Sequence, residues 1–410
     1  MAPEEGTSTA PMQRPAPRPS WLAARRLSRV LCLDDFESVA RRHLPRPIFG
    51  YVAGAAETHA SYRDNRAVFD EYGFRHRVLR NVSDRESSID LLGRRYSAPF
   101  GIAPMGICSL TGYRGDLAQA RAAERAGIPM ILSASSLIRL EEVVEEAPGT
   151  WFQAYLPAKS AEIDALIDRV ARAGVETLVI TVDSAVVPNR ENNVRNGFKT
   201  PLRPSWRLLW DGMTHPAWSL GTFLKTCVRH GVPHFENNAA KRGVAIVSRQ
   251  VTRDFSGREH LDWFELKRIR RRWTGRLVIK GVLHPDDVAL ARQHGADGVI
   301  ISNHGGRQLD GAVSPLRALP HALEVAGGME VMIDSGFRRG TDVIKALALG
   351  ASCAFVGRPF NYASAIGAEA GVDHAIQLLM SEIRADMGML GITRLAELDA
   401  EELVDLAQRR

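Results

Sequence analysis

From residue 98 onward, short apolar runs alternate along the chain with longer amphipathic stretches. The runs are too short for helices and are rich in β-branched residues, which is typical of buried parallel strands. They lie at residues 100–103, 129–132, 151–155, 178–183, 277–280, 299–302, 331–334 and 353–356. Between them, stretches such as Ser160–Ala173 and Asp286–His294 carry the helical period. The pattern predicts an α/β fold of eight strand–helix units, which is a (β/α)8 TIM barrel.

The main alternative is a doubly wound sheet, which usually has about five or six strands. In its dinucleotide-binding members, the motif G-x-G-x-x-G follows the first strand. No such motif follows the first run here. The number of runs and the missing motif both favour the barrel.

The remaining segments divide the chain further. Residues 1–30 are rich in Pro, Arg, Ala and Ser without a continuous apolar stretch, so we expect a disordered basic arm rather than a transit peptide. Residues 31–97 are expected to be a helical lead-in that includes a capped helix from Asp34 to Leu44. Residues 98–410 hold the barrel, and the long gap after the fourth strand predicts an insert at residues 195–245.

The insert has an unusual composition. Three tryptophans and two phenylalanines stand among arginines and lysines between Trp206 and Phe235. Aromatic residues interleaved with cations are typical of a membrane interface or a partner surface. A lid packed over the barrel would explain them equally well, so the insert is either a lid or a membrane-docking segment.

Polar residues gather where six of the predicted strands end. The C-terminal strand ends and the loops after them form the active site of a TIM barrel. The residues at these ends are Gln153, Tyr155, Thr181, Asp183, Lys280, His304, Arg307, Asp334 and Arg358. Polar groups at six strand ends indicate an enzyme active site.

The stretch after the sixth strand, Ser302–Asp310, carries the most informative chemistry. His304 can take a proton near neutral pH, and Arg307 can hold a carboxylate with two parallel hydrogen bonds. A base and an anion clamp this close suit a substrate with a carboxylate beside an acidic proton. Taken alone, this spacing would fit a strand end with a satisfied histidine and a solvated arginine.

The last two strand–helix units indicate an anion site. Gly336–Gly340 and Gly357–Arg358 offer unhindered backbone N–H groups, positive charge and a helix N-terminus. The loops after strands seven and eight are the usual phosphate position in this fold. A phosphorylated cofactor is the expected occupant.

Composition excludes several classes of protein. A formal net charge of +6 suits an anionic substrate or membrane surface but is too small to indicate nucleic acid. The four cysteines have no C-x-x-C spacing, so no zinc or other metal site is expected, and a reducing compartment fits best. No run reaches the length of about 20 apolar residues that a membrane span needs. We expect a cytoplasmic enzyme, with the insert as a means of peripheral attachment to the inner face of the cell membrane.

At this point the chain resembles a known family, the FMN-dependent 2-hydroxy acid dehydrogenases and oxidases. This family includes glycolate oxidase, L-lactate dehydrogenase and (S)-mandelate dehydrogenase. The resemblance runs from about residue 31 to the C-terminal helices and is carried by the strings SNHGGRQLD, WFQAY, IKG, DSGFRRGTDVIKALALGA and VGRP. It implies an FMN cofactor, a homotetramer, and oxidation of an (S)-2-hydroxy acid with electrons passed to a quinone or cytochrome. The alternatives are an oxidase that makes hydrogen peroxide and a non-catalytic flavin-binding scaffold.

The resemblance also implies a role for each matching residue. His304 is the base, oriented by Asp183, and Lys280 lies beside the flavin. Arg190 and Arg307 clamp the substrate carboxylate, and Tyr51 and Tyr155 bond the substrate, with Tyr155 and Arg307 also counted as catalytic. The implied FMN contacts are Pro104, Met105, Gly106, Ser133, Gln153, Thr181, Lys280, Ser302, Asp334, Gly336, Arg338, Gly357 and Arg358.

Two substrate-pocket positions depart from the glycolate oxidase pattern. Gly106 stands where that enzyme has an alanine, and Ser135 where it has a tryptophan. Both changes remove volume beside the substituent of the substrate α-carbon. The resemblance therefore favours a bulkier acid than glycolate, of the mandelate type, and makes L-lactate the less favoured substrate.

Overall fold

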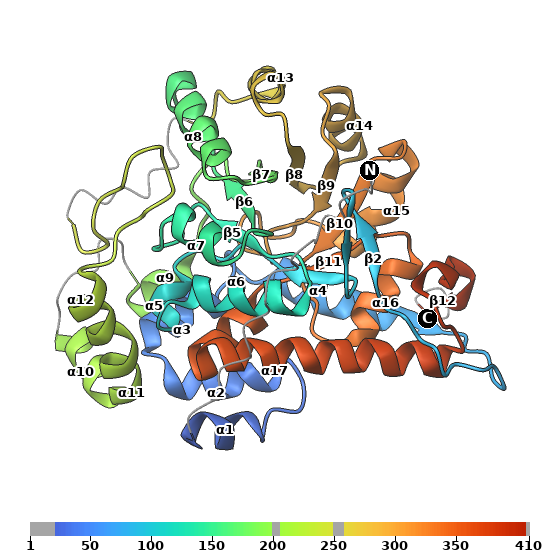
Figure 1. Cartoon of the computed structure of the whole chain (residues 1–410), viewed down its shortest axis with the longest axis horizontal. Coiled ribbons are helices and arrows are strands. Elements are labelled where there is room, and N and C mark those ends of the chain that lie inside the picture. Colours follow the sequence, from blue (N-terminus) through green and yellow to red (C-terminus); the bar gives the residue numbers. More distant parts are fainter. Residues whose placement is uncertain (1–20, 199–205, 249–257, 407–410) are drawn as a thin grey trace, which may run out of the picture.

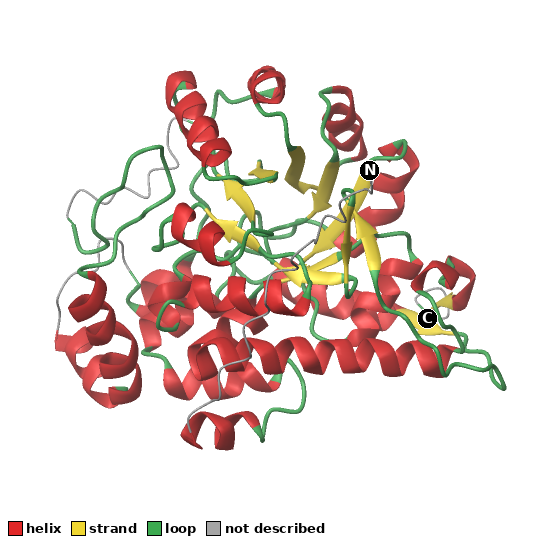
Figure 2. Cartoon of the chain, viewed as in Figure 1, coloured by secondary structure: helices red, strands yellow, loops and turns green. Residues whose placement is uncertain are grey.

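Eight parallel strands form the centre of the molecule and are surrounded by helices (Figure 2). The computed structural model describes residues 21–198, 206–248 and 258–406. The hydrogen-bonded strand order is β4-β11-β10-β9-β8-β7-β6-β5, and a bridge between Ile102 and Met130 joins the two ends into a barrel. The strands are β4 (Phe100–Ile102), β5 (Ile131–Ser133), β6 (Trp151–Ala154), β7 (Thr177–Thr181), β8 (Arg276–Val282), β9 (Gly298–Ile301), β10 (Glu330–Asp334) and β11 (Ala354–Val356). The predicted TIM barrel is confirmed.

Helices cover the outside of the barrel (Figure 1). In α8, the buried residues Ile163, Leu166, Ile167 and Val170 recur at helical spacing and form the face toward the barrel. The covering helices are α5 (Cys108–Thr111), α6 (Gly115–Ala126), α7 (Leu140–Glu146), α8 (Ser160–Arg172), α13 (Trp263–Arg272), α14 (Pro285–Gln293), α15 (Pro315–Ala326), α16 (Gly340–Ala348) and α17 (Arg358–Leu390). The long α17 is interrupted at Ala368, where φ is 49°.

The alternation of side chains along the strands determines where the site lies. Every second residue of a strand points into the barrel. One such layer is apolar and fills the barrel, and it contains Ile131, Trp151, Val179, Val278, Ile300, Met332 and Phe355. The residues two positions later in each strand stand one layer nearer the C-terminal ends, and they are Ser133, Gln153, Thr181, Lys280, Ser302, Asp334 and Gly357. A hydrophobic floor therefore lies directly beneath a polar layer.

The N-terminal lead-in packs on the barrel from two sides. It contains α2 (Asp35–His43), α3 (Arg46–Ala53), α4 (Ala60–Ala67), η1 (Val68–Glu71), β1 (Tyr72–Phe74), β2 (Ile89–Leu91) and β3 (Arg94–Tyr96). The β2–β3 hairpin closes the end of the barrel at which the strands begin. There the Tyr96 hydroxyl accepts a hydrogen bond from Trp151 Nε1 at 3.1 Å. The last described elements are η3 (Leu395–Glu397), η4 (Ala400–Glu402) and β12 (Leu403–Asp405), and β12 pairs with β1.

The prediction of a disordered arm is wrong for residues 21–30. Trp21–Leu27 form helix α1, which contacts α17. Leu27 and Val30 are buried there, with 6% and 1% exposure. The composition of the stretch gave no sign of this, because the apolar partner lies at the other end of the chain. Residues 1–20 lie outside the described part of the chain.

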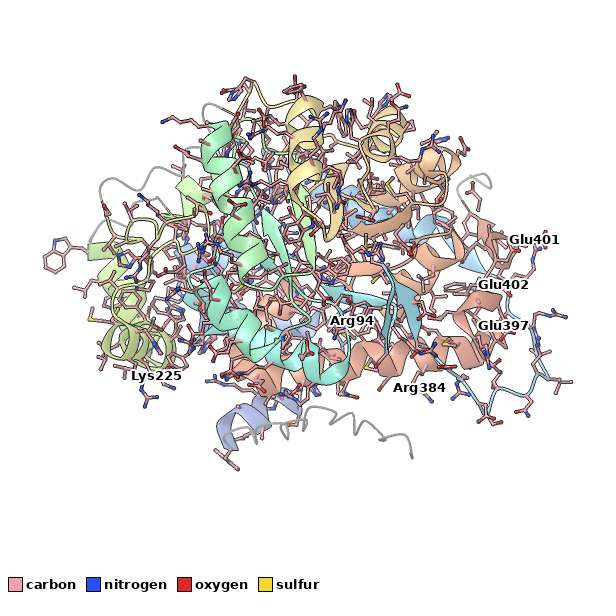
Figure 3. All side chains as sticks on the ribbon, turned by 45° about the horizontal axis from the view of Figure 1, so that its top comes forward. Arg94, Lys225, Arg384, Glu397, Glu401 and Glu402 are labelled. Carbon is pink, nitrogen blue, oxygen red and sulfur yellow. The ribbon has the colours of Figure 1, made fainter. Side chains whose placement is uncertain are left out.

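Between β7 and β8 the described residues form α9 (Glu191–Asn196), α10 (Trp206–Thr214), α11 (Pro216–Trp218), the π-helix η2 (Ser219–Leu224) and α12 (Lys225–His230), followed by α13. Helices α10, α11 and α12 lie together at one edge of the molecule, whereas α9 packs beside α3 (Figure 1). Figure 3 shows Lys225 on this edge, on the opposite side of the molecule from Glu401 and Glu402. No helix in the described ranges is long and apolar enough to cross a membrane.

Candidate active site

A pocket opens at the C-terminal end of the barrel, above the polar layer. Most of the predicted site residues line it, and they are Tyr51, Pro104, Met105, Gly106, Ser135, Tyr155, Thr181, Arg190, Lys280, His304, Arg307, Asp334, Gly336, Arg338, Gly357 and Arg358. Four others, Ser133, Gln153, Asp183 and Ser302, lie outside the lining: Ser133, Asp183 and Ser302 each bond a residue of the lining, and Gln153 bonds Ser133. The fold thus brings together residues from α3, the strand ends and the loop that follows β7.

His304 and Asp183 form a partly buried pair at this pocket. His304 Nδ1 lies 3.0 Å from Asp183 Oδ1 and 3.2 Å from Oδ2. Burial lowers the pKa of His304, and the Asp183 carboxylate offsets only part of that effect. Burial raises the pKa of Asp183, but His304 and Lys280 outweigh this and hold that pKa below its usual value. The pair is therefore a neutral imidazole beside an ionised carboxylate.

The tautomer of His304 follows from this pairing. An ionised carboxylate only accepts hydrogen bonds, so Nδ1 carries the proton and Nε2 keeps its lone pair. The Tyr155 hydroxyl lies 3.4 Å from Nε2. Burial raises the pKa of Tyr155, so its hydroxyl stays protonated and can donate. The backbone of His304 has a φ of 58°, a conformation that costs energy and recurs at functional sites.

The two predicted carboxylate-binding arginines differ in their contacts. Arg307 donates to the backbone oxygens of Tyr51, Val52 and Gly54, at the C-terminus of α3, over 2.6–3.1 Å. Arg190 instead donates through Nε to the Arg307 backbone oxygen at 2.9 Å and through Nη2 to Gln308 Oε1 at 2.6 Å. Both line the pocket, but the Arg307 guanidinium also anchors the C-terminal end of α3 through these hydrogen bonds.

Positive charge is concentrated near the predicted phosphate position. Arg358 is buried and donates to the backbone oxygens of Val52, Gly54 and Gly305. Burial and the neighbouring Arg307 guanidinium lower the pKa of Arg358 to about 10. Arg338, also buried, lies 3.2 Å from Asp34 Oδ1. The buried guanidiniums of Arg358 and Arg307 repel each other, so an anion in the pocket would stabilise both of them.

The space around Gly106 is smaller than the sequence suggested. A Cβ added at Gly106 would lie 2.9 Å from Ser135 Cβ and 3.4 Å from the Tyr51 hydroxyl. Gly106 and Ser135 lie against each other, so part of the space that larger side chains would occupy at these positions is already filled. Phe235 of the insert is buried and lines the same pocket.

Several pocket residues were missed by the sequence reasoning. Phe235, Asn238 and Arg258 come from the stretch before β8, and no periodicity in that stretch pointed inward. Arg258 also lies beyond the predicted end of the insert at residue 245, with its guanidinium carbon 5.7 Å from the Tyr155 ring centre. Gln308 was within the quoted signature string, where its polar side chain was the available signal.

Comparison with known proteins agrees with this geometry. A family model described as FMN-dependent dehydrogenase matches residues 40–405. The chain belongs to the FMN-dependent dehydrogenase family. It is therefore an FMN-dependent oxidoreductase, as predicted.

Individual relatives of this FMN-dependent dehydrogenase cover nearly the whole chain. It is 36% identical over 378 residues to (S)-mandelate dehydrogenase of Pseudomonas putida, covering 90% of this chain and 93% of that protein. It is 37% identical over 383 residues to L-lactate dehydrogenase of Stenotrophomonas maltophilia (strain R551-3), covering 91% and 98%.

Solved structures extend the comparison. The structure of the monotopic membrane protein (S)-mandelate dehydrogenase matches with a TM-score of 0.83 and 35% identity, covering 92% of this chain and 99% of that chain. A mandelate oxidase with (S)-2-phenylpropionate matches with a TM-score of 0.75 and 33% identity, covering 92% and 98%.

The residues of the polar layer fit the isoalloxazine ring of FMN. Gln153 is 1% exposed, its Oε1 accepts from Ser133 Oγ at 3.0 Å, and its Nε2 has no hydrogen-bond partner in the described part of the chain. An orphaned buried amide donor is costly unless a ligand satisfies it. Lys280 Nζ, held 2.8 Å from both Ser302 Oγ and Asp334 Oδ2, supplies a buried positive charge in the same layer. A polar, electron-accepting ring is the kind of group that this layer can bind.

Proposed function

We propose that this dehydrogenase oxidises an (S)-2-hydroxy acid with a bulky, mandelate-like substituent to the 2-oxo acid. The single observation that supports it best is the His304–Asp183 pair, which leaves Nε2 of a partly buried neutral imidazole beside a pocket lined by Arg190 and Arg307. A base next to two guanidiniums suits a substrate whose acidic proton adjoins a carboxylate. The names of the relatives, mandelate and L-lactate dehydrogenases, support the same substrate class.

In this proposal the protein's own groups bind the substrate and move a proton. Arg190 and Arg307 hold the carboxylate, and the hydroxyls of Tyr51 and Tyr155 bond the substrate. His304 Nε2 takes one of the two protons released by the oxidation, and Asp183 stabilises the imidazolium that forms. FMN, when bound, would supply the acceptor of the two electrons and of the other proton. Gln153, Thr181 and Lys280 would hold its ring, with Pro104, Met105 and Gly106 alongside, and Gly336, Arg338, Gly357 and Arg358 would hold its phosphate.

The pocket walls support a large substituent over a methyl group. Gly106 and Ser135 contribute little side-chain volume, although their close contact fills part of that space, and Phe235 adds an aromatic wall. Burying about 80 Å² more apolar surface at about 25 cal/mol per Å² contributes about 2 kcal/mol, or roughly thirtyfold in specificity. An aryl 2-hydroxy acid is therefore the proposed substrate, with L-lactate as the weaker one.

The first test uses the purified FMN-loaded enzyme without oxygen. We expect (S)-mandelate to bleach the flavin with a higher kcat/KM than L-lactate. A preference for lactate would contradict the substrate class, and no bleaching by either acid would contradict the function. Reoxidation of the flavin by a quinone, with only slow reoxidation by air, would support the dehydrogenase. Rapid reoxidation of the flavin by air, with formation of hydrogen peroxide, would favour the oxidase.

We also propose that the insert docks on an anionic membrane. A set of apolar side chains on α10, η2 and α12 is exposed, and we call it the docking face: Trp206, Leu209, Trp210, Met213, Leu220, Leu224 and Val228. Trp206 and Trp210 are 87% and 64% exposed, and the cations Lys225 and Arg229 lie on the same group of helices. Apolar side chains beside cations suit the surface of an anionic bilayer.

Two other residues of the insert, Trp218 and Asn237, attach it to the barrel. Trp218 is buried and its Nε1 donates to the Leu110 backbone oxygen at 2.8 Å. Asn237 is also buried, and it accepts from the Leu140 N–H at 2.9 Å and donates to the Ile138 oxygen at 2.7 Å. In this proposal the insert supplies both a wall of the pocket, at Phe235, and an outward face for docking.

Vesicles of phosphatidylglycerol and phosphatidylcholine test the docking face. The enzyme should pellet with them at about 0.05 M salt and be released near 1 M, where the Debye length falls to about 3 Å. Changing Trp206 and Trp210 together to serine should abolish pelleting and preserve turnover with a small dye. Trp21→Ser, which removes an exposed tryptophan from α1, is the matched control and should pellet normally. Failure of the parent enzyme to pellet at low salt would contradict the proposal.

The assembly is a separate proposal. The family resemblance supports a homotetramer, and sedimentation velocity of the FMN-loaded enzyme in detergent would measure it. A monomer across micromolar concentrations would contradict it.

A further inference from the structure

Gln308 joins two parts of the pocket that come from different loops. Its Nε2 donates to the Asp183 backbone oxygen at 2.8 Å, and its Oε1 accepts from Arg190 Nη2 at 2.6 Å. The side chain is half-buried and lines the pocket. Asp183 holds the catalytic histidine, and Arg190 faces the position proposed for the substrate carboxylate. The amide group of Gln308 therefore contacts both the loop that carries Asp183 and the guanidinium of Arg190.

The guanidinium of Arg190 is held along one edge by this loop. Its Nε donates to the Arg307 backbone oxygen and its Nη2 to Gln308 Oε1, so two consecutive residues supply both acceptors. Two acceptors on one edge fix the plane of a guanidinium, which a single bond would leave free to rotate. The short loop after β9 thereby determines how Arg190 is presented to the pocket.

The roles of the two arginines make this orientation important. The Arg307 guanidinium already donates to three backbone oxygens at the C-terminal end of α3, so part of its hydrogen-bonding capacity is committed there. Arg190 lies directly before α9, in the long stretch between β7 and β8, and none of the residues of α9 is buried. A side chain from such a segment loses more conformational entropy when it binds an anion, unless a neighbour holds it beforehand.

We propose that Gln308 is a positioning residue for carboxylate recognition. It holds the Arg190 guanidinium at a fixed position relative to the loop that carries Asp183. This inference rests on the proposed function, because it takes the ligand of Arg190 to be the carboxylate of a 2-hydroxy acid. The amide is suited to the task because it donates at one end and accepts at the other. A hydrocarbon side chain of similar length does neither. A carboxylate keeps the bond to Arg190 but cannot donate to the Asp183 oxygen.

Two variants separate these contributions. Gln308→Met removes both hydrogen bonds at similar volume, and Gln308→Glu keeps one of them while adding a negative charge near the substrate carboxylate. Gln293→Met, at an exposed position at the end of α14, is the matched control. All three are compared as FMN-loaded proteins, with melting temperature and flavin content measured first.

The binding probe is phenylacetate, which carries the carboxylate and the ring but has no hydroxyl to oxidise. Its dissociation constant comes from the change in flavin absorbance on titration, and thermal stabilisation by the same compound provides a second readout. Losing one charge-assisted hydrogen bond weakens binding by about tenfold. We expect at least that for Gln308→Met, a larger loss for Gln308→Glu, and no change for Gln293→Met.

Turnover distinguishes positioning from general damage. We expect KM for (S)-mandelate to rise in both Gln308 variants, while KM for the neutral amide of mandelate changes much less. Equal losses on the acid and the amide, or an unchanged phenylacetate affinity, would overturn the role of Gln308. A parent enzyme that (S)-mandelate does not bleach would instead overturn the proposed function. A parent that bleaches normally beside unaffected variants would overturn only the role of Gln308.

Discussion

Replacing Asp183 by asparagine isolates the electrostatic part of the proposed mechanism. The change keeps the size of the side chain and its hydrogen-bonding reach to His304 Nδ1, which lies 3.0 Å from Oδ1. It removes the negative charge that would stabilise the imidazolium. An amide can also present its N–H₂ group to Nδ1, which would favour the tautomer with the proton on Nε2, where the base must be free.

The size of the effect follows from the distance. Two unit charges about 4 Å apart interact by about 4 kcal/mol at an effective dielectric constant of about 20. If the imidazolium is fully formed in the transition state, this corresponds to a loss of about three orders of magnitude in rate. The direction of the pH effect is also fixed. Asp183 raises the pKa of His304, so removing its charge lowers that pKa further below 6.5 and moves the acid limb of kcat/KM to lower pH.

The assay is anaerobic stopped-flow reduction of the flavin by (S)-mandelate from pH 5 to pH 9. Asp373→Asn is the matched control, because Asp373 accepts hydrogen bonds from Arg125 at 2.8 Å and lies outside the pocket lining. It should reduce at the parent rate. An Asp183→Asn enzyme within about tenfold of the parent rate, or with its acid limb moved to higher pH, would refute the reasoning.

Two further variants test the cofactor and substrate ends of the pocket. Arg358→Met should weaken FMN retention by about tenfold or more, because the phosphate loses a buried charge-assisted partner. FMN fluorescence released on dilution measures this, with the exposed Arg384→Met as control, and an Arg358 variant that stays as yellow as the parent would contradict the phosphate assignment. Ser135→Trp should refill the space beside the α-carbon substituent and reverse the preference of the enzyme from mandelate to L-lactate. An unchanged ratio of kcat/KM for the two acids would show that Ser135 does not limit substrate size.

The barrel and the location of the site were predictable because they rest on local patterns. Alternation along each strand places Val278 in the hydrophobic floor and Lys280, two residues later, in the polar layer. The same rule places Gln153 above Trp151. Eight short apolar runs separated by helical stretches are visible in the sequence and identify the fold, and the polar residues that follow the runs identify the end at which the chemistry lies.

Contacts between distant segments were not predictable in the same way. Nothing around Leu27 indicates that it packs on α17, so the extent of the disordered arm was overestimated. The aromatic composition of the insert was visible, but its division into a pocket wall at Phe235 and an exposed face at Trp210 depends on which side meets the barrel. The attachment of Arg307 to α3 likewise depends on backbone oxygens, which every residue carries and no motif reveals.

The most direct test of the account is single-turnover flavin reduction in His304→Asn. The variant should purify with the FMN content of the parent, because His304 has no proposed contact with the phosphate. Mixed with (S)-mandelate without oxygen, the parent flavin should bleach, whereas the variant should bleach slower by about 10²–10⁴-fold or more, as expected when a general base is lost. A His304→Asn enzyme that retains FMN and bleaches at the parent rate would contradict the assignment of His304 as the base on which the mechanism rests.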